Sequence, residues 1–269
     1  MAKKVEQQEN NEKAHIFYRR DYRHVNARPI ETIFLLFVTV VPFIYLMIEK
    51  YGDFAYWLNK KTVGLFKELF GIEPAINKVK FFPFTDPISY LEISGKTPGF
   101  TACLIIAVLS LFLILICLQI FTQNKPLMIY ISISLFITMI SALYFMFFKD
   151  KFPYTLGSYT YLYMSQQFVI WCMVAIITSV SLAVLPGIYG FDFLTFIVIM
   201  VYSILFGSVR YIVFVLGLNF LSNLFMAPVY FMFGIFLDFL YIVAIYAVYV
   251  RKVSDVYSKR KEQGRWSWS

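Results

Sequence analysis

The clearest clue to the fold is the run FLTFIVIMVYSILFGSVRYIVFV at residues 193–215, in which Arg210 is the only charged residue. About 18 consecutive apolar residues are enough to predict a transmembrane helix. Further apolar runs lie at residues 32–48, 101–121, 127–148, 168–186 and 228–250. At about 1.5 Å per residue, each can cross roughly 30 Å of hydrocarbon, the first only just. The sequence therefore predicts an all-α, multi-pass bundle of about six spans.

The composition of the 269-residue chain supports this class. The chain is 60% hydrophobic and 15% charged, whereas a soluble domain is about 45–50% apolar and about 25% charged. An ordinary water-soluble enzyme is therefore disfavoured, and a disordered chain and a disulfide scaffold are excluded. A membrane β-barrel is disfavoured, because its strands would alternate polar and apolar residues and these runs do not. The three cysteines, Cys103, Cys117 and Cys172, lie inside predicted spans, where we expect them to pack as small apolar residues.

We expect three parts: a basic tail at 1–31, a transmembrane domain at 32–250 with an outer loop at 50–100, and a basic tail at 251–269. An even number of spans places both tails on one side. Lys and Arg are denser in the tails than in the loop, which predicts an inner-membrane protein with both termini in the cytoplasm. The expected surroundings of the tails are the anionic headgroups of the bilayer. No recognisable motif predicts binding to nucleic acid.

The outer loop carries several local signals. Asp53 is suited to cap an amphipathic helix that begins at Phe54 and lies on the membrane surface or packs on the bundle. Residues 79–93 are expected to form short extended pieces. Thr97 is suited to cap the second span. Two further expectations concern the spans: Pro42 should kink the first, and the break between the last two should fall between Gly217–Asn219 and Pro228.

Two charges inside the predicted spans are candidate binding residues. Arg210 is expected either to face a cavity or a partner, or to extend to the outer interface. Asp238 lies deeper and should be neutral or hydrogen-bonded, because a lone carboxylate there is costly. Gln166 and Gln167 lie near the outer end of the fourth span and are candidates to join a polar cluster with Arg210.

The placement of the histidines limits the possible chemistry. Both, His15 and His24, lie in the N-terminal tail. No histidine is therefore expected to serve as a general base or zinc ligand within the membrane or on its outer face. The sequence has no G-x-x-x-x-G-K-[ST] loop for an ATPase. We expect no metal and no cofactor.

Three short motifs carry a resemblance to one family. Ile93-Ser94-Gly95-Lys96-Thr97-Pro98-Gly99-Phe100 resembles the exosortase/archaeosortase segment in which Cys-Ser-Gly opens a helix at the outer face. Ser208-Val209-Arg210-Tyr211-Ile212-Val213 is similar to the Asn-x-x-Arg-Ile helix of that family, and Ala227-Pro228-Val229-Tyr230 stands where the family has a His. The resemblance covers roughly residues 75–250, and each motif is short.

The resemblance implies a membrane transpeptidase that cuts a C-terminal sorting signal with a Cys nucleophile, helped by Arg and His. Only Arg210 matches, whereas Thr97 replaces the Cys and Pro228 replaces the His. Threonine without a base is a poor nucleophile, and proline has no side-chain proton to transfer. We therefore expect Thr97, Arg210 and Pro228 to converge at the outer rim of a degenerate relative without the usual catalysis.

Three functions follow as hypotheses. The first is a non-catalytic accessory subunit in surface-protein sorting or in exopolysaccharide synthesis or export, with membrane subunits of that system as partners. The second is an active transpeptidase or protease that uses Cys103 or Thr97. The third is a transporter in which Arg210 attracts an anion and Asp238 takes part in coupling.

Overall fold

A computed structural model describes residues 29–80, 83, 85–120, 125–183 and 189–262. Most of the N-terminal tail, with both histidines, and residues 263–269 of the C-terminal tail lie outside the described residues. Six helices in the described part are long and apolar enough to cross a membrane. This confirms the all-α, multi-pass class and the number of spans.

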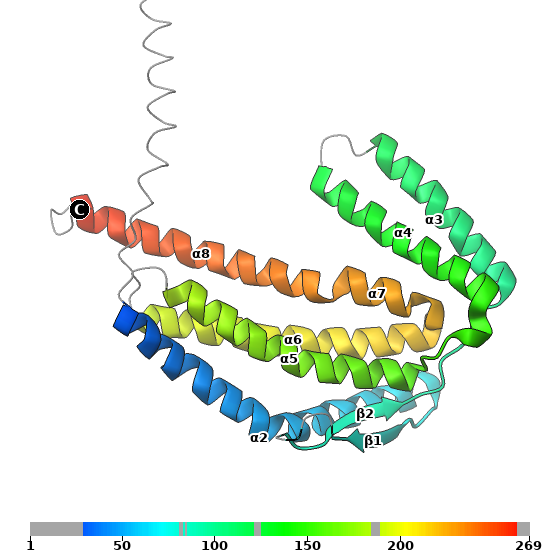
Figure 1. Cartoon of the computed structure of the whole chain (residues 1–269), viewed down its shortest axis with the longest axis horizontal. Helices are drawn as coiled ribbons and strands as arrows, with labels where there is room; N and C mark the ends of the chain where they lie inside the picture. Colours follow the sequence, from blue (N-terminus) through cyan, green and yellow to red (C-terminus); the bar gives the residue numbers. More distant parts are fainter. Residues whose placement is uncertain (1–28, 81–82, 84, 121–124, 184–188, 263–269) are drawn as a thin grey trace, which may run out of the picture.

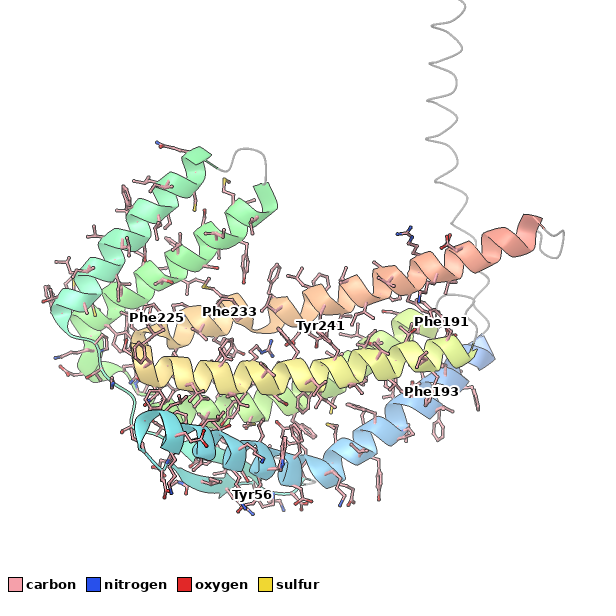
Figure 2. All side chains as sticks on the ribbon, turned by 180° about the vertical axis from the view of Figure 1, so that it is seen from behind. Tyr56, Phe191, Phe193, Phe225, Phe233 and Tyr241 are labelled. Carbon is pink, nitrogen blue, oxygen red and sulfur yellow. The ribbon has the colours of Figure 1, made fainter. Side chains whose placement is uncertain are left out.

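The elements follow one another as α2 (Pro29–Phe70), β1 (Ala75–Val79), β2 (Ile88–Glu92), α3 (Phe100–Ile120), α4 (Lys125–Phe148), η2 (Lys149–Lys151), α5 (Leu156–Ala183), α6 (Tyr189–Leu221), η3 (Asn223–Phe225), α7 (Met226–Phe233) and α8 (Ile235–Glu262). Figure 1 shows that α2 begins and α8 ends at the same end of the molecule, with β1 and β2 at the opposite end. We call these the tail end and the hairpin end. Large apolar side chains project outward along the helices, as lipid contact requires (Figure 2).

Helix α2 corrects the prediction of a separate amphipathic helix. It runs without interruption from Pro29 to Phe70, so Asp53 lies inside it and is not a cap. Pro42 is also internal, and Figure 1 shows α2 changing direction along its length. The helix continues past the first span because its second half is anchored on the bundle. The Tyr51 hydroxyl donates to the backbone oxygen of Met164 at 2.5 Å.

The second half of α2 and the β1–β2 hairpin form a layer on α5 at the hairpin end. The two strands are antiparallel, with Ala75 opposite Glu92 and Val79 opposite Ile88. The Thr160 hydroxyl of α5 donates to the Leu91 oxygen at 2.6 Å. Of the two expected locations for this part of α2, the structure shows packing on the bundle. Strand β2 confirms part of the expected extended pieces, whereas β1 begins earlier than residue 79.

Helices α3 and α4 pack against each other as a hairpin that diverges from α5, α6 and α8 (Figure 1). The hairpin is attached near η3, where the Ser141 hydroxyl donates to the Leu224 oxygen at 2.6 Å. The amide of Cys103 donates to the Gly99 oxygen at 3.1 Å. Helix α3 therefore begins after Thr97, and Thr97 is not its cap.

The break between the last two predicted spans falls within the predicted segment, between Asn219 and Pro228, but the helices differ in extent from the predicted spans. Helix α6 continues to Leu221, so Gly217–Asn219 lie inside it, and the chain reverses at Ser222 and η3. Pro228 lies in the first turn of α7, where a proline costs little because the amides there have no intrahelical acceptor. The sixth predicted span is interrupted at Gly234, which separates α7 from α8. Helix α5 also begins well before residue 168, at Leu156.

Candidate functional site

Arg210 of α6 faces the interruption between α7 and α8. Its Nη1 donates to the backbone oxygens of Phe233 and Gly234, both at 3.0 Å. The last carbonyls of a helix have no intrahelical donor, and a cation at this end is favourable. Arg210 therefore supplies a donor to the Phe233 carbonyl, which ends α7, and a second donor to the Gly234 carbonyl, which also accepts from the Leu237 amide at 3.2 Å. Such donors matter where water is scarce.

Asp238 supplies the countercharge from the first turn of α8. Its Oδ2 lies 2.9 Å from Nη2 of Arg210, and the side chains are 3% and 4% exposed. The expectation that Asp238 is hydrogen-bonded is confirmed, although the main partner is an arginine. The other carboxylate oxygen, Oδ1, has no hydrogen-bond partner among the described residues.

Helix α5 completes the set of acceptors. The Tyr163 hydroxyl accepts from Nε of Arg210 at 2.7 Å and donates to the Gly207 oxygen at 3.3 Å. Gln167, one turn further along α5, accepts from Nη2 through its Oε1 at 3.1 Å. We call Arg210, Asp238, Gln167, Tyr163 and the two carbonyls the Arg210 cluster. All five N–H groups of the guanidinium have an acceptor in it.

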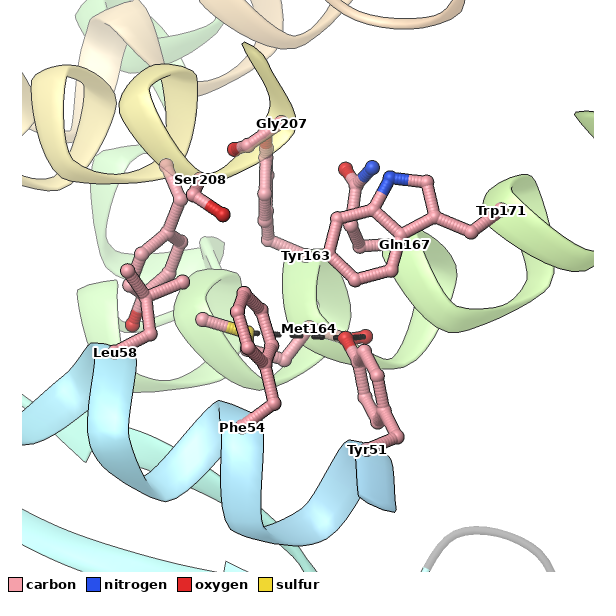
Figure 3. A pocket seen from close by; sticks show the side chains of 10 residues that line it. Tyr51, Phe54, Leu58, Tyr163, Met164, Gln167, Trp171, Gly207 and Ser208 are labelled. Carbon is pink, nitrogen blue, oxygen red and sulfur yellow. Dashed lines mark hydrogen bonds between the residues drawn. The ribbon is translucent and has the colours of Figure 1, made fainter. Parts of the chain in front are cut away.

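Gly207 has no side chain and so leaves space for the amide of Gln167. A Cβ at position 207 would lie 2.7 Å from Nε2 of Gln167 and 3.2 Å from Cζ2 of Trp171. Figure 3 shows Gly207, Gln167, Trp171 and Tyr163 around the same narrow pocket between α2, α5 and α6. This pocket is too tight to admit a water molecule. In this conformation it offers no space for a ligand.

The two glutamines of α5 have different partners. Both were candidates to join Arg210, and only Gln167 does so. Gln166 accepts a hydrogen bond from the Tyr230 hydroxyl of α7. Gln166 therefore links α5 to the segment after η3 and does not belong to the Arg210 cluster.

Thr97 and Arg210 do not meet through hydrogen bonds. Thr97 is exposed in the segment before α3, and this segment is tied to η3 by the amide of Asn223, which donates to the Lys96 oxygen at 3.0 Å. Arg210 lies about 16 Å along α6 from Leu221, counted at 1.5 Å per residue. All N–H donors of Arg210 bind other groups. Arg210 therefore forms no hydrogen bond with Thr97 or Pro228, and its hydrogen bonds do not show the expected convergence of the three residues.

Cys103 lies apart from the Arg210 cluster. It is fully buried between α3, α4 and η3 with Ala142, Phe145 and Leu224. No group of three or more His, Cys, Asp or Glu able to hold a metal occurs among the described residues. The surroundings of Cys103 are those of a packing residue.

Sequence reasoning missed the partners that make Arg210 structural. Nothing local marks Tyr163 or the carbonyls of Phe233 and Gly234, since one glycine in an apolar run does not reveal a helix break. Gly207 offered a weak signal in the sequence, because a small residue three positions before an arginine in a span leaves space for a neighbouring side chain.

Comparisons with protein-family models, curated proteins and solved structures found no match. The resemblance to exosortases and archaeosortases therefore rests on the three short motifs alone.

Proposed function

We propose that this membrane protein is a non-catalytic relative of exosortases that serves as an accessory subunit in surface-protein sorting or in exopolysaccharide synthesis or export. The observation that carries the proposal is the saturation of Arg210. A catalytic arginine needs N–H groups free for the substrate, and here protein acceptors hold all five. Binding a substrate through Arg210 would require breaking bonds that hold α6 to α5, α7 and α8.

The other positions of the family motif support the same conclusion. Thr97 stands where the resemblance implies the nucleophile, and its hydroxyl has no histidine to activate it among the described residues. Pro228 stands at the implied histidine and cannot carry a proton on its side chain. Cys103 is sealed from solvent by apolar neighbours, so a substrate peptide has no access to its thiol.

The test is complementation of a deletion strain. A double variant, Thr97→Ala with Cys103→Ala, should restore surface-polymer yield and the processing of sorted surface proteins as fully as the wild type. Immunoblots of the membrane fraction should show equal protein levels. Loss of either activity at a normal membrane level would contradict the non-catalytic role and favour the transpeptidase hypothesis.

The accessory role is tested separately by co-purification with membrane subunits of the sorting or polymer system. Arg210→Ala should weaken this association, because it frees the α7–α8 junction, whereas Thr97→Ala should preserve it. Equal association of both variants, with Arg210→Ala folded, would contradict a role of the Arg210 cluster in presenting the partner surface.

A transporter is the second candidate, favoured by the interrupted helix at Gly234. Broken helices in transporters place backbone dipoles and charges at a substrate site near the bilayer midplane. Against this reading, Asp238 is buried and paired with Arg210. The pocket beside Gln167 also has no room for water. The test is the uptake of anions into proteoliposomes. Uptake by the wild type that is lost in Asp238→Asn would favour the transporter over the accessory subunit.

A further inference from the structure

The exposed side of the second half of α2 is basic and aromatic. Tyr56, Trp57, Lys60 and Lys61 are spaced so that they share one side of the helix, and all four are exposed. Lys78 of β1 joins them, because its Nζ lies 5.0 Å from the centre of the Tyr56 ring. We call these five residues the basic-aromatic face. Figure 2 shows Tyr56 on the side of α2 that is turned away from the bundle.

The positive charge of this face is not neutralised within the described part of the chain. None of its three lysines forms an ion pair with a described residue. Lys67, further along α2, differs because it pairs with Glu73, and this contact holds the pKa of the Glu73 carboxyl below its usual value. Asp53 and Glu68 lie only at the two ends of the exposed stripe. The centre of the face therefore attracts an anionic partner.

The depth of the face is that of lipid headgroups. The exposed surface of α2 is apolar up to Leu46 and becomes charged at Glu49 and Lys50. Counted from Ile33, where the candidate span begins, about 30 Å of helix ends near Asp53, and Tyr56 and Trp57 follow within about the next 6 Å. The headgroup layer is roughly 5–8 Å thick on each side of the hydrocarbon, and Trp and Tyr are enriched at this level.

We propose that the basic-aromatic face binds anionic phospholipid headgroups in the leaflet at the hairpin end. The lysines donate to phosphate oxygens, and the rings of Tyr56 and Trp57 lie at the boundary between headgroups and acyl chains. The combination of aromatic rings with lysines at this depth favours a lipid over a soluble acidic protein or polymer. The proposal is independent of the accessory role.

The test uses the quenching of Trp57 fluorescence in the full chain. The protein is placed in phosphatidylcholine nanodiscs containing a fixed fraction of brominated phosphatidylglycerol or of brominated phosphatidylcholine. Subtraction of the Trp57→Phe spectrum isolates Trp57 from the three other tryptophans. We expect at least roughly threefold stronger quenching by the brominated anionic lipid, since each lysine near an anionic surface adds to the attraction. The excess should fall as salt rises from about 0.1 to about 1 M.

The variant Lys60→Gln/Lys61→Gln/Lys78→Gln should bring the quenching ratio to about one. The matched control Lys67→Gln/Lys149→Gln/Lys151→Gln removes the same charge elsewhere and should keep the wild-type ratio. Equal quenching by the two brominated lipids in the wild type would overturn the proposal. So would an anionic preference that survives in the first variant, or one that the control variant abolishes.

Discussion

Nη2 of Arg210 lies 2.9 Å from Oδ2 of Asp238, and this ion pair joins α6 to the first turn of α8 across the break at Gly234. A transmembrane segment interrupted at this point exposes carbonyl groups that lipid cannot satisfy. The arginine donates to the carbonyls of Phe233 and Gly234, the second of which also accepts from the Leu237 amide, and its charge is neutralised by the carboxylate of α8. The pair therefore stabilises the break, and removing one member should be costly.

The first prediction concerns the charge balance of this pair. Asp238→Asn should destabilise the protein by about 3–5 kcal/mol, because it leaves the buried guanidinium without its countercharge. Arg210→Met combined with Asp238→Leu should recover part of the loss, since no unpaired charge remains. Thermal unfolding in detergent, followed by the loss of monodisperse protein, measures both effects.

Asp53→Asn on the exposed side of α2 is the control for this pair and should leave the unfolding temperature unchanged. An Asp238→Asn protein as stable as the wild type would show that the ion pair contributes nothing.

The second prediction concerns the close approach of α5 to α6. Gly207→Ala should destabilise the protein by roughly 1 kcal/mol or more, because the new Cβ would displace the Gln167 amide from Arg210. Gly217→Ala on the same helix meets no atom within 4 Å. It should be neutral or stabilising by up to about 1 kcal/mol, since alanine favours helix. The same thermal assay distinguishes them, and equal shifts would refute the packing argument.

The third prediction concerns the contact between the segment before α3 and η3. A Cβ at Gly95 would lie 1.9 Å from Oδ1 of Asn223, so Gly95→Ala should detach this segment. Trypsin should then cleave after Lys96 severalfold faster than in the wild type. Gly99→Ala meets no atom within 4 Å and should be cleaved at the wild-type rate. Unchanged cleavage of Gly95→Ala would show that the segment is not held by this contact.

The fourth prediction concerns orientation. Thr97 is exposed at the hairpin end, so Thr97→Cys should react with a membrane-impermeant maleimide in intact cells if both tails are cytoplasmic. Arg251→Cys, near the tail end, should react only after the membrane is permeabilised. The wild type should remain unlabelled from outside, because Cys103 and Cys117 are buried and the half-buried Cys172 packs on the core in the middle of the α5 span. The reverse pattern would place both termini outside.

The number of spans was predictable because the length and apolarity of a run are local properties. The interruption at Gly234 was not, since a glycine in an apolar run equally well serves close helix packing. The continuity of α2 past Asp53 could not be predicted from the sequence either. It depends on Tyr51 and Leu58, which pack on a helix more than a hundred residues further along the chain.

The candidate site was only partly predictable. The sequence placed Asp238 deeper than Arg210, whereas counting from the observed turn at Ser222 places the two at similar depths. Depth does not fix the rotation of each helix, so their pairing did not follow from it. Gln167 was expected as a neighbour of Arg210, but Gln166 was expected equally, and only the direction of each side chain separates them.

The residue order alone established a bundle of membrane-spanning helices, because burying so much apolar surface without lipid is impossible for a chain of this length. Whether Arg210 is free to act or fully engaged was settled only when three helices came together around it. The apolarity of each run can be read from consecutive residues. The five N–H donors of Arg210, in contrast, need acceptors that come from distant positions in the chain.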